Sequence, residues 1–121
     1  MANLFEELKE CLQENGHELS DIEHVYCSHY QITLENFIEV SKKTSYHSGF
    51  GGQEVANDLY IKGKDFLITR GEYDGSEWFQ FNSLKVPVET EKISKLASSD
   101  SSWSSLKEIN DRVYEDDEEA T

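Results

Sequence analysis

The stretch DFLITRGEYDGSEWFQF, residues 65–81, decides the fold because it has the pattern of a β-hairpin. Two runs rich in aromatic and β-branched residues, 65–73 and 77–81, flank an Asp-Gly pair, and such a pair between two such runs is a strong hairpin signal. A third strand is expected at residues 58–62, before a glycine-containing corner. The sequence therefore predicts an antiparallel meander of three strands at the core of the fold.

A helix is predicted upstream of the meander, over residues 4–15. Its apolar residues recur at helical spacing, and Asn3 with Glu6 resembles a capping box at its start. Gly16 supplies a C-terminal stop. The opposite face carries three glutamates: Glu7, Glu10 and Glu14.

A second helix is expected to begin after Thr33, which is a good N-cap residue. Lys42 and Lys43 suit its last turn, where positive charge is favourable. One alternative stays open, because residues 32–40 can also be interpreted as a strand. Two short extended segments are expected before this helix: His24–Cys27 and Tyr30–Ile32.

The part of the chain after the meander is polar. Residues 83–101 are interpreted as a linker, and a final helix is predicted over residues 102–114. The apolar stripe of this helix has four members: Trp103, Leu106, Ile109 and Val113. The predicted protein is thus α+β, with one domain over residues 1–114 and an acidic, disordered tail at residues 115–121.

Net charge is the most unusual property of the sequence: 25 acidic residues oppose 11 basic ones, which gives a formal charge of −14. Such a field repels nucleic acids and anionic membranes, so neither is expected as a direct partner. It attracts a basic protein surface and speeds the encounter; the alternative is that the charge only confers solubility. No signal-peptide pattern or apolar span is visible, so a cytoplasmic location is expected.

No catalytic motif or cofactor site is recognisable, and enzymatic activity is not expected. The glycine-rich segment at residues 48–52 lacks the Lys-Ser/Thr pair of a phosphate-binding loop. Three potential metal ligands lie close together in the sequence, His24, Cys27 and His29, and His47 could join them in three dimensions. They lack the paired spacing of zinc motifs. No metal site is therefore expected, and a small metal-dependent enzyme using these residues is only the third hypothesis for function.

Two segments have the composition of a binding site. The first is the predicted hairpin tip, which combines acids with aromatic residues: Glu72, Tyr73, Asp74, Glu77 and Trp78. The second is an acidic run near the C-terminus: Glu115, Asp116, Asp117, Glu118 and Glu119. The alternatives stay open, because Trp78 can equally belong to the core and both sets of acids can simply face water.

Three motifs in the centre of the chain carry a resemblance to known proteins. They are Ser-Gly-Phe-Gly-Gly at 48–52, Asp-Leu-Tyr-Ile at 58–61 and Glu-Tyr-Asp-Gly-Ser-Glu-Trp at 72–78. With them, residues 20–85 resemble small uncharacterised phage proteins of Gram-positive bacteria. No enzymatic activity comes with this resemblance. By a weaker analogy of size, charge and origin, the chain is similar to acidic anti-CRISPR proteins, several of which resemble DNA mimics.

These observations lead to a hypothesis of function. The chain is expected to be a phage-encoded acidic inhibitor that binds a host nucleic-acid enzyme, with a Cas9-type CRISPR effector as the first candidate. Such effectors hold nucleic acid in a positively charged channel, from which the carboxylates would exclude DNA. The alternative hypothesis is a non-enzymatic phage accessory or regulatory protein that binds another host protein.

Overall fold

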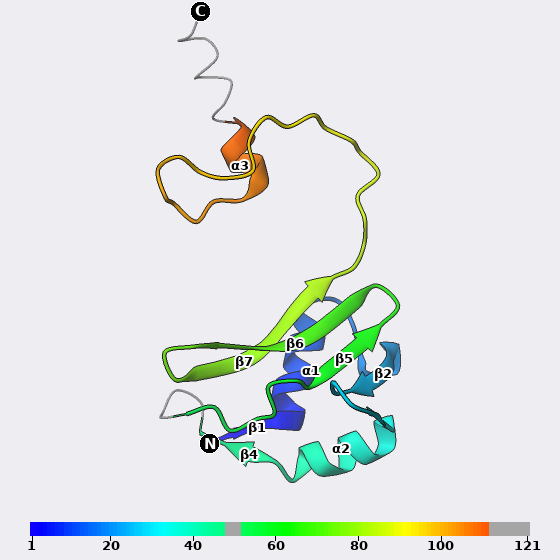
Figure 1. The fold of residues 1–121 in the computed structure, drawn as a ribbon. Helices are drawn as coiled ribbons and strands as arrows, with labels where there is room; N and C mark the ends of the chain where they lie inside the picture. The colour runs from blue at the N-terminus through cyan, green and yellow to red at the C-terminus, as the bar shows by residue number, and fades with distance from the viewer. Residues whose placement is uncertain (48–51, 112–121) are drawn as a thin grey trace, which may run out of the picture. The chain divides into compact units, whose positions relative to one another are not determined.

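The computed structural model describes residues 1–47 and 52–111, which form a mixed α+β fold (Figure 1). The chain divides into two compact units, Met1–Val86 and Pro87–Thr121. Of the described residues, the first unit holds both β-sheets and two α-helices, and the second holds one further α-helix. The expected α+β class is confirmed.

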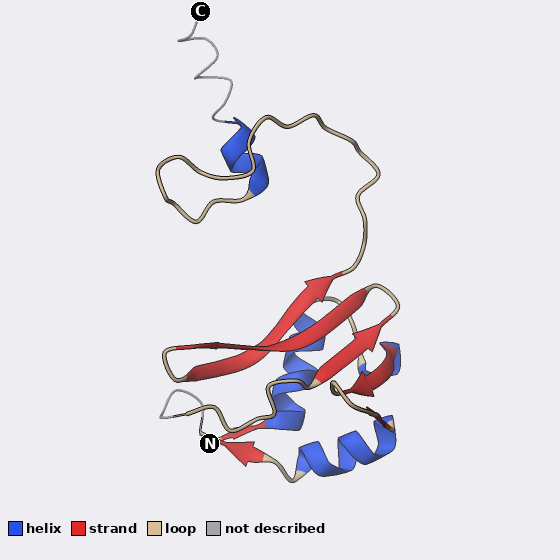
Figure 2. Ribbon diagram, viewed as in Figure 1, coloured by secondary structure: helices blue, strands red, loops and turns tan. Residues whose placement is uncertain are grey.

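The central sheet of the first unit has five antiparallel strands in the order β3-β2-β5-β6-β7 (Figure 2). The strands are β2 (Ile22–Tyr26), β3 (Gln31–Ile32), β5 (Tyr60–Gly63), β6 (Phe66–Tyr73) and β7 (Ser76–Ser83). The last three are the predicted meander, which is confirmed. The sheet is wider than predicted because the expected extended segments, β2 and β3, join it through pairing between β2 and β5.

Two glycines in the hairpin have positions that require glycine. Asp74 and Gly75 form the turn between β6 and β7 with φ values of 49° and 87°, the left-handed conformation that tight hairpins need. Gly71 lies opposite Trp78 in the ladder, and a Cβ at Gly71 would lie 2.7 Å from the indole. The absence of a side chain at Gly71 therefore lets Trp78 lie directly over the backbone of β6.

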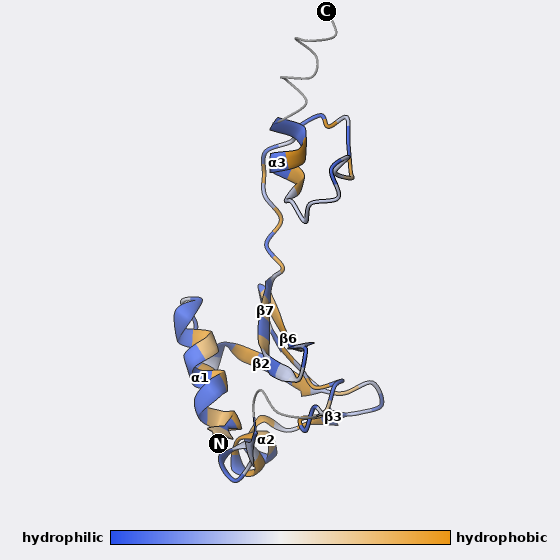
Figure 3. Ribbon diagram, turned by 90° about the vertical axis from the view of Figure 1, so that its left-hand side faces the viewer, coloured by the Kyte–Doolittle hydropathy of each residue, from blue (hydrophilic) through white to orange (hydrophobic). Residues whose placement is uncertain are grey.

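Helix α1 (Leu4–Glu14) packs against one face of the sheet, which Figure 3 shows nearly edge-on. Its caps are the predicted ones: the Asn3 side chain accepts the backbone N–H of Glu6 at 3.1 Å, and Gly16 follows the helix with a φ of 75°. The core joins α1 to the sheet through buried apolar residues that include Leu8, Leu12, Val25, Ile61, Phe66, Ile68 and Phe79. Full burial of each such side chain contributes about 1.5–3 kcal/mol.

Helix α2 (Leu34–Lys42) confirms the helical interpretation of this segment, so the strand alternative is wrong. The Thr33 side chain accepts the N–H of Asn36 and caps the helix, as predicted. The helix packs against α1 and β2. A small second sheet, formed by β1 (Ala2–Asn3) and β4 (Ser45–Tyr46), ties the chain after α2 to the start of α1.

In the second unit, α3 (Leu106–Asp111) begins later than predicted. Ser105 caps it, and Trp103, expected on its apolar stripe, lies before it with its side chain exposed. The reason is local: Ser102 and Asp100 hydrogen-bond to each other, and such side-chain bonds compete with helix formation. The predicted end of the helix lies outside the described residues. Among the helices that the structure describes, none is both long and apolar enough to cross a membrane.

Candidate binding surface

The predicted contact residues of the hairpin tip lie in different environments. Glu72, Tyr73 and Asp74 are exposed, Tyr73 to 76%. Trp78 is 37% exposed. Strand residues alternate between the two faces of a sheet, and the neighbours Glu77 and Phe79 are buried on the side of α1. Trp78 therefore lies on the face that points away from α1. Glu77 is one of those neighbours and is only 4% exposed.

Glu77 belongs to an ionic cluster around Arg70, whose side chain is 5% exposed. The Arg70 guanidinium donates to Glu77 at 2.8 Å and to Glu7 at 3.0 Å. The Tyr46 hydroxyl accepts from Arg70 and donates to Glu7. The Phe79 ring centroid lies 4.6 Å from the guanidinium carbon, at cation–π distance. This cluster joins α1, β4, β6 and β7.

Glu77 has a structural role in this cluster. Besides Arg70, its carboxylate accepts the backbone N–H groups of Glu54 and Val55 at 2.8 and 3.2 Å. Burial by itself raises the pKa of Glu77, but the hydrogen bonds that it accepts from the Glu54 N–H, the Arg70 side chain and the Val55 N–H outweigh burial, so the pKa lies below its usual value. Glu77 was predicted to be a surface contact; because its carboxylate is buried and bonded to Arg70 and two backbone N–H groups, we do not include it among the proposed contacts with a partner.

A solvent-open groove of about 500 Å³ runs between α1 and β7. It is lined by Glu7, Glu10, Cys11, Glu14, Asn15, Glu77, Trp78, Phe79, Gln80 and Phe81. The five lining residues of β7 are consecutive and point alternately to opposite faces, so the groove follows the edge of the strand. Within the described residues, β7 is the last strand of the sheet and its ladder pairs only with β6.

The groove has the chemistry to receive a basic, extended peptide. A free strand edge can accept an added strand through main-chain hydrogen bonds. Glu10 and Glu14 are exposed on the facing helix, and carboxylates form strong, charge-assisted bonds with arginine. Phe81, which is partly exposed, provides apolar surface for the stem of a long basic side chain.

Sequence reasoning missed both the Arg70 cluster and the groove. The spacing of Glu7, Glu10 and Glu14 placed them on one helix face, but no sequence signal showed that β7 lies beside that face. A single arginine within an apolar strand was the available signal for the cluster. The predicted tail acids, Glu115 to Glu119, lie outside the described residues.

The potential metal ligands are only partly brought together. Cys27 and His29 lie close to each other and to Asp58, a residue that no sequence pattern had indicated as a ligand. His24 instead lies 3.1 Å from the Gln31 side chain. His47 lies 3.9 Å from Glu54.

Comparison with known proteins gives no relative from which a role could be inferred. No protein-family model, no curated protein and no solved structure matches the chain.

Proposed function

We propose that the protein binds a basic segment of a partner protein in the groove between α1 and β7, and that it thereby inhibits a nucleic-acid enzyme as an acidic decoy. The observation that carries this proposal is that β7, the edge strand of the described sheet, lines a groove together with exposed glutamates of a neighbouring helix. The edge supplies main-chain hydrogen bonds, and the glutamates select for positive charge.

The charge of the whole molecule supports the same class of partner. A formal charge of −14 steers a positively charged surface toward the protein and accelerates association at low salt. At the end of the groove, the exposed hairpin tip adds Glu72, Tyr73 and Asp74, which can extend the contact beyond the strand edge. Binding should therefore weaken as salt screens these charges.

The partner proposed first is a Cas9-type effector in a bacterial cytoplasm, with the chain as a phage-encoded inhibitor. Such effectors bind nucleic acid through a positively charged channel. Arginine and lysine residues in that channel are the groups that the groove and the tip would engage. DNA would then be excluded by competition for these residues.

The test is inhibition of DNA cleavage by a purified Cas9-type effector, with the full chain and with two charge-matched double variants. E10Q/E14Q neutralises the groove, and E35Q/E39Q neutralises two exposed glutamates of α2 at the same spacing. In E10Q/E14Q, two ion pairs between the groove and the partner are lost. Because such pairs are partly exposed to solvent, inhibition should weaken roughly tenfold, equivalent to about 1.4 kcal/mol of binding free energy. The α2 variant should retain most of the inhibition.

The outcomes separate the parts of the proposal. Equal weakening by both variants would mean that total charge, and not the groove, determines binding. Complete absence of inhibition would remove the nuclease as partner. Binding of an arginine-rich synthetic peptide, compared between the same two variants, tests the groove independently of any enzyme.

A further inference from the structure

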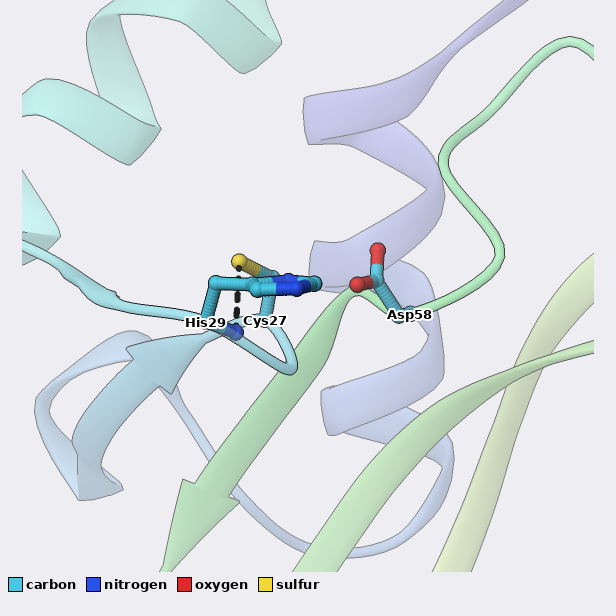
Figure 4. Close-up of side chains that lie close together, drawn as sticks. All are labelled: Cys27, His29 and Asp58. Atoms are coloured by element: carbon cyan, nitrogen blue, oxygen red, sulfur yellow. Dashed lines mark hydrogen bonds between the residues drawn. The ribbon is translucent and has the colours of Figure 1, made fainter.

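The turn between β2 and β3 brings three different metal-ligating groups together. The Cys27 N–H donates to the Tyr30 carbonyl at 2.9 Å and closes this turn. The sulfur of Cys27, an imidazole nitrogen of His29 and a carboxylate oxygen of Asp58 all lie within 4.8 Å of one another. Figure 4 shows the His29 ring extending from the turn toward the Asp58 carboxylate.

The sheet fixes the relative position of these groups. Tyr26 of β2 pairs with Tyr60 of β5, so the residue after Tyr26 lies beside the residues that precede Tyr60 in this antiparallel pair. Leu59 is buried and anchors the chain next to Asp58. The backbone N–H of Ser28 donates to the Asp58 carboxylate at 3.2 Å and orients it.

We propose that Cys27, His29 and Asp58 form a binding site for a divalent transition metal, with Zn²⁺ as the preferred ion. Sulfur, imidazole nitrogen and carboxylate oxygen are all established zinc ligands, and a mixed set of this kind suits a borderline-soft ion. Three protein ligands leave a fourth tetrahedral position for water or for a donor atom of a partner. This site is separate from the groove and does not depend on the proposed function.

The distances are compatible with closure around an ion. Zinc–ligand bonds of about 2.0–2.3 Å at tetrahedral angles separate the ligand atoms by about 3.4–3.6 Å. The ligand atoms of the three residues lie at most 4.8 Å apart. Shortening these distances by about 1 Å brings the atoms to the separation that zinc requires. His29 is exposed at the tip of the turn, where its side chain can make most of that movement.

The same three residue types also occur in cysteine hydrolases, but the contacts favour a metal. A nucleophilic cysteine needs its base within hydrogen-bond reach and the base held by a third group. In the described structure, the His29 ring hydrogen-bonds to neither Cys27 nor Asp58; the bond to the thiol comes from the His29 backbone N–H at 3.5 Å. The ring nitrogens therefore remain available to a metal ion.

The test is titration of the reduced, metal-free full chain with Co²⁺, which reports thiolate ligation by a near-ultraviolet charge-transfer band. We expect saturation at one Co²⁺ per chain and displacement by Zn²⁺. Cys27→Ser should abolish the band, whereas Cys11→Ser should leave it unchanged. Binding of Co²⁺ without a thiolate band, or with a band that persists in Cys27→Ser, would overturn the proposal.

Histidine and carboxylate variants complete the test. His29→Ala and Asp58→Asn should each weaken Zn²⁺ binding by more than the roughly 10- to 100-fold that loss of an outer-shell partner costs. The amide introduced by Asp58→Asn keeps an oxygen that can accept the Ser28 N–H, so the turn should remain folded. His24→Ala is the matched control and should bind normally. Normal binding by His29→Ala would also overturn the assignment.

Discussion

Glu72 and Glu77 lie directly opposite each other in the hairpin, yet they belong to two different regions of the molecule. Glu72 is part of the exposed tip, where it accepts a bond from the Gln53 side chain. Glu77 lies inside, paired with Arg70 and capped by two backbone N–H groups. The comparison shows that, at two paired positions, the glutamate surrounded by a buried arginine and N–H donors is part of the interior, whereas its neighbour faces solvent.

The largest effect should come from removing the cation of the inner region. Arg70→Met leaves Glu77 buried without its ionic partner, and breaking a buried pair in this way costs about 3–5 kcal/mol of unfolding free energy. Chemical denaturation of the two proteins measures the loss. The exposed Lys64→Met should change stability by less than about 0.5 kcal/mol. A loss below about 1 kcal/mol for Arg70→Met would show that the cluster does not stabilise the fold.

The next prediction compares the two opposed glutamates. Glu77→Gln removes the charge that Arg70 and the Glu54 N–H bind, and should destabilise the protein by about 1.5–3 kcal/mol. Glu72→Gln, at the exposed position, should stay within about 0.5 kcal/mol of the parent protein. Equal effects of the two substitutions in denaturant unfolding would contradict the distinction between inner and outer regions.

A third prediction concerns the contact between Trp78 and Gly71, at the border of the two regions. Gly71→Ala places a methyl group against the indole and should cost about 1–2 kcal/mol, because a tightly packed contact tolerates no added carbon. In a Trp78→Ala background the same change should cost much less, since its partner is gone. An unchanged cost in the double variant would place the strain in the backbone instead.

The last prediction concerns the pH dependence of the Glu77 contribution, which should be lost gradually and only at acidic pH. Because the pKa of Glu77 is lowered in the folded state, its contribution to stability is fully present above the usual glutamate pKa of about 4.3. The contribution disappears as the pH falls through the lower folded-state value. As the pH is lowered from neutral through the folded-state pKa of Glu77, the unfolding free energies of the parent protein and of Glu77→Gln should therefore converge. A constant difference between them at every pH would argue that the charge of Glu77 is not involved.

Local signals in the sequence predicted the elements well, while contacts between distant segments could not be predicted. Asp74 and Gly75 indicated the hairpin, and the caps at Asn3 and Thr33 located two helices. The pairing of Tyr26 with Tyr60 depends on segments far apart in the chain and has no local signature, so the five-stranded sheet was missed. The candidate metal site could not be predicted for the same reason, because Cys27 and Asp58 come together only through that pairing.

The position of β7 at the edge of the described sheet has a consequence for self-association. An unpaired strand edge is a template on which a second copy of a protein can continue the sheet. Two copies meeting at this edge would bring Glu10 and Glu14 of each near the same residues of the other, and like charges brought together oppose the contact. We therefore expect the glutamates beside the groove to oppose self-association through this edge, and to oppose it less at high ionic strength.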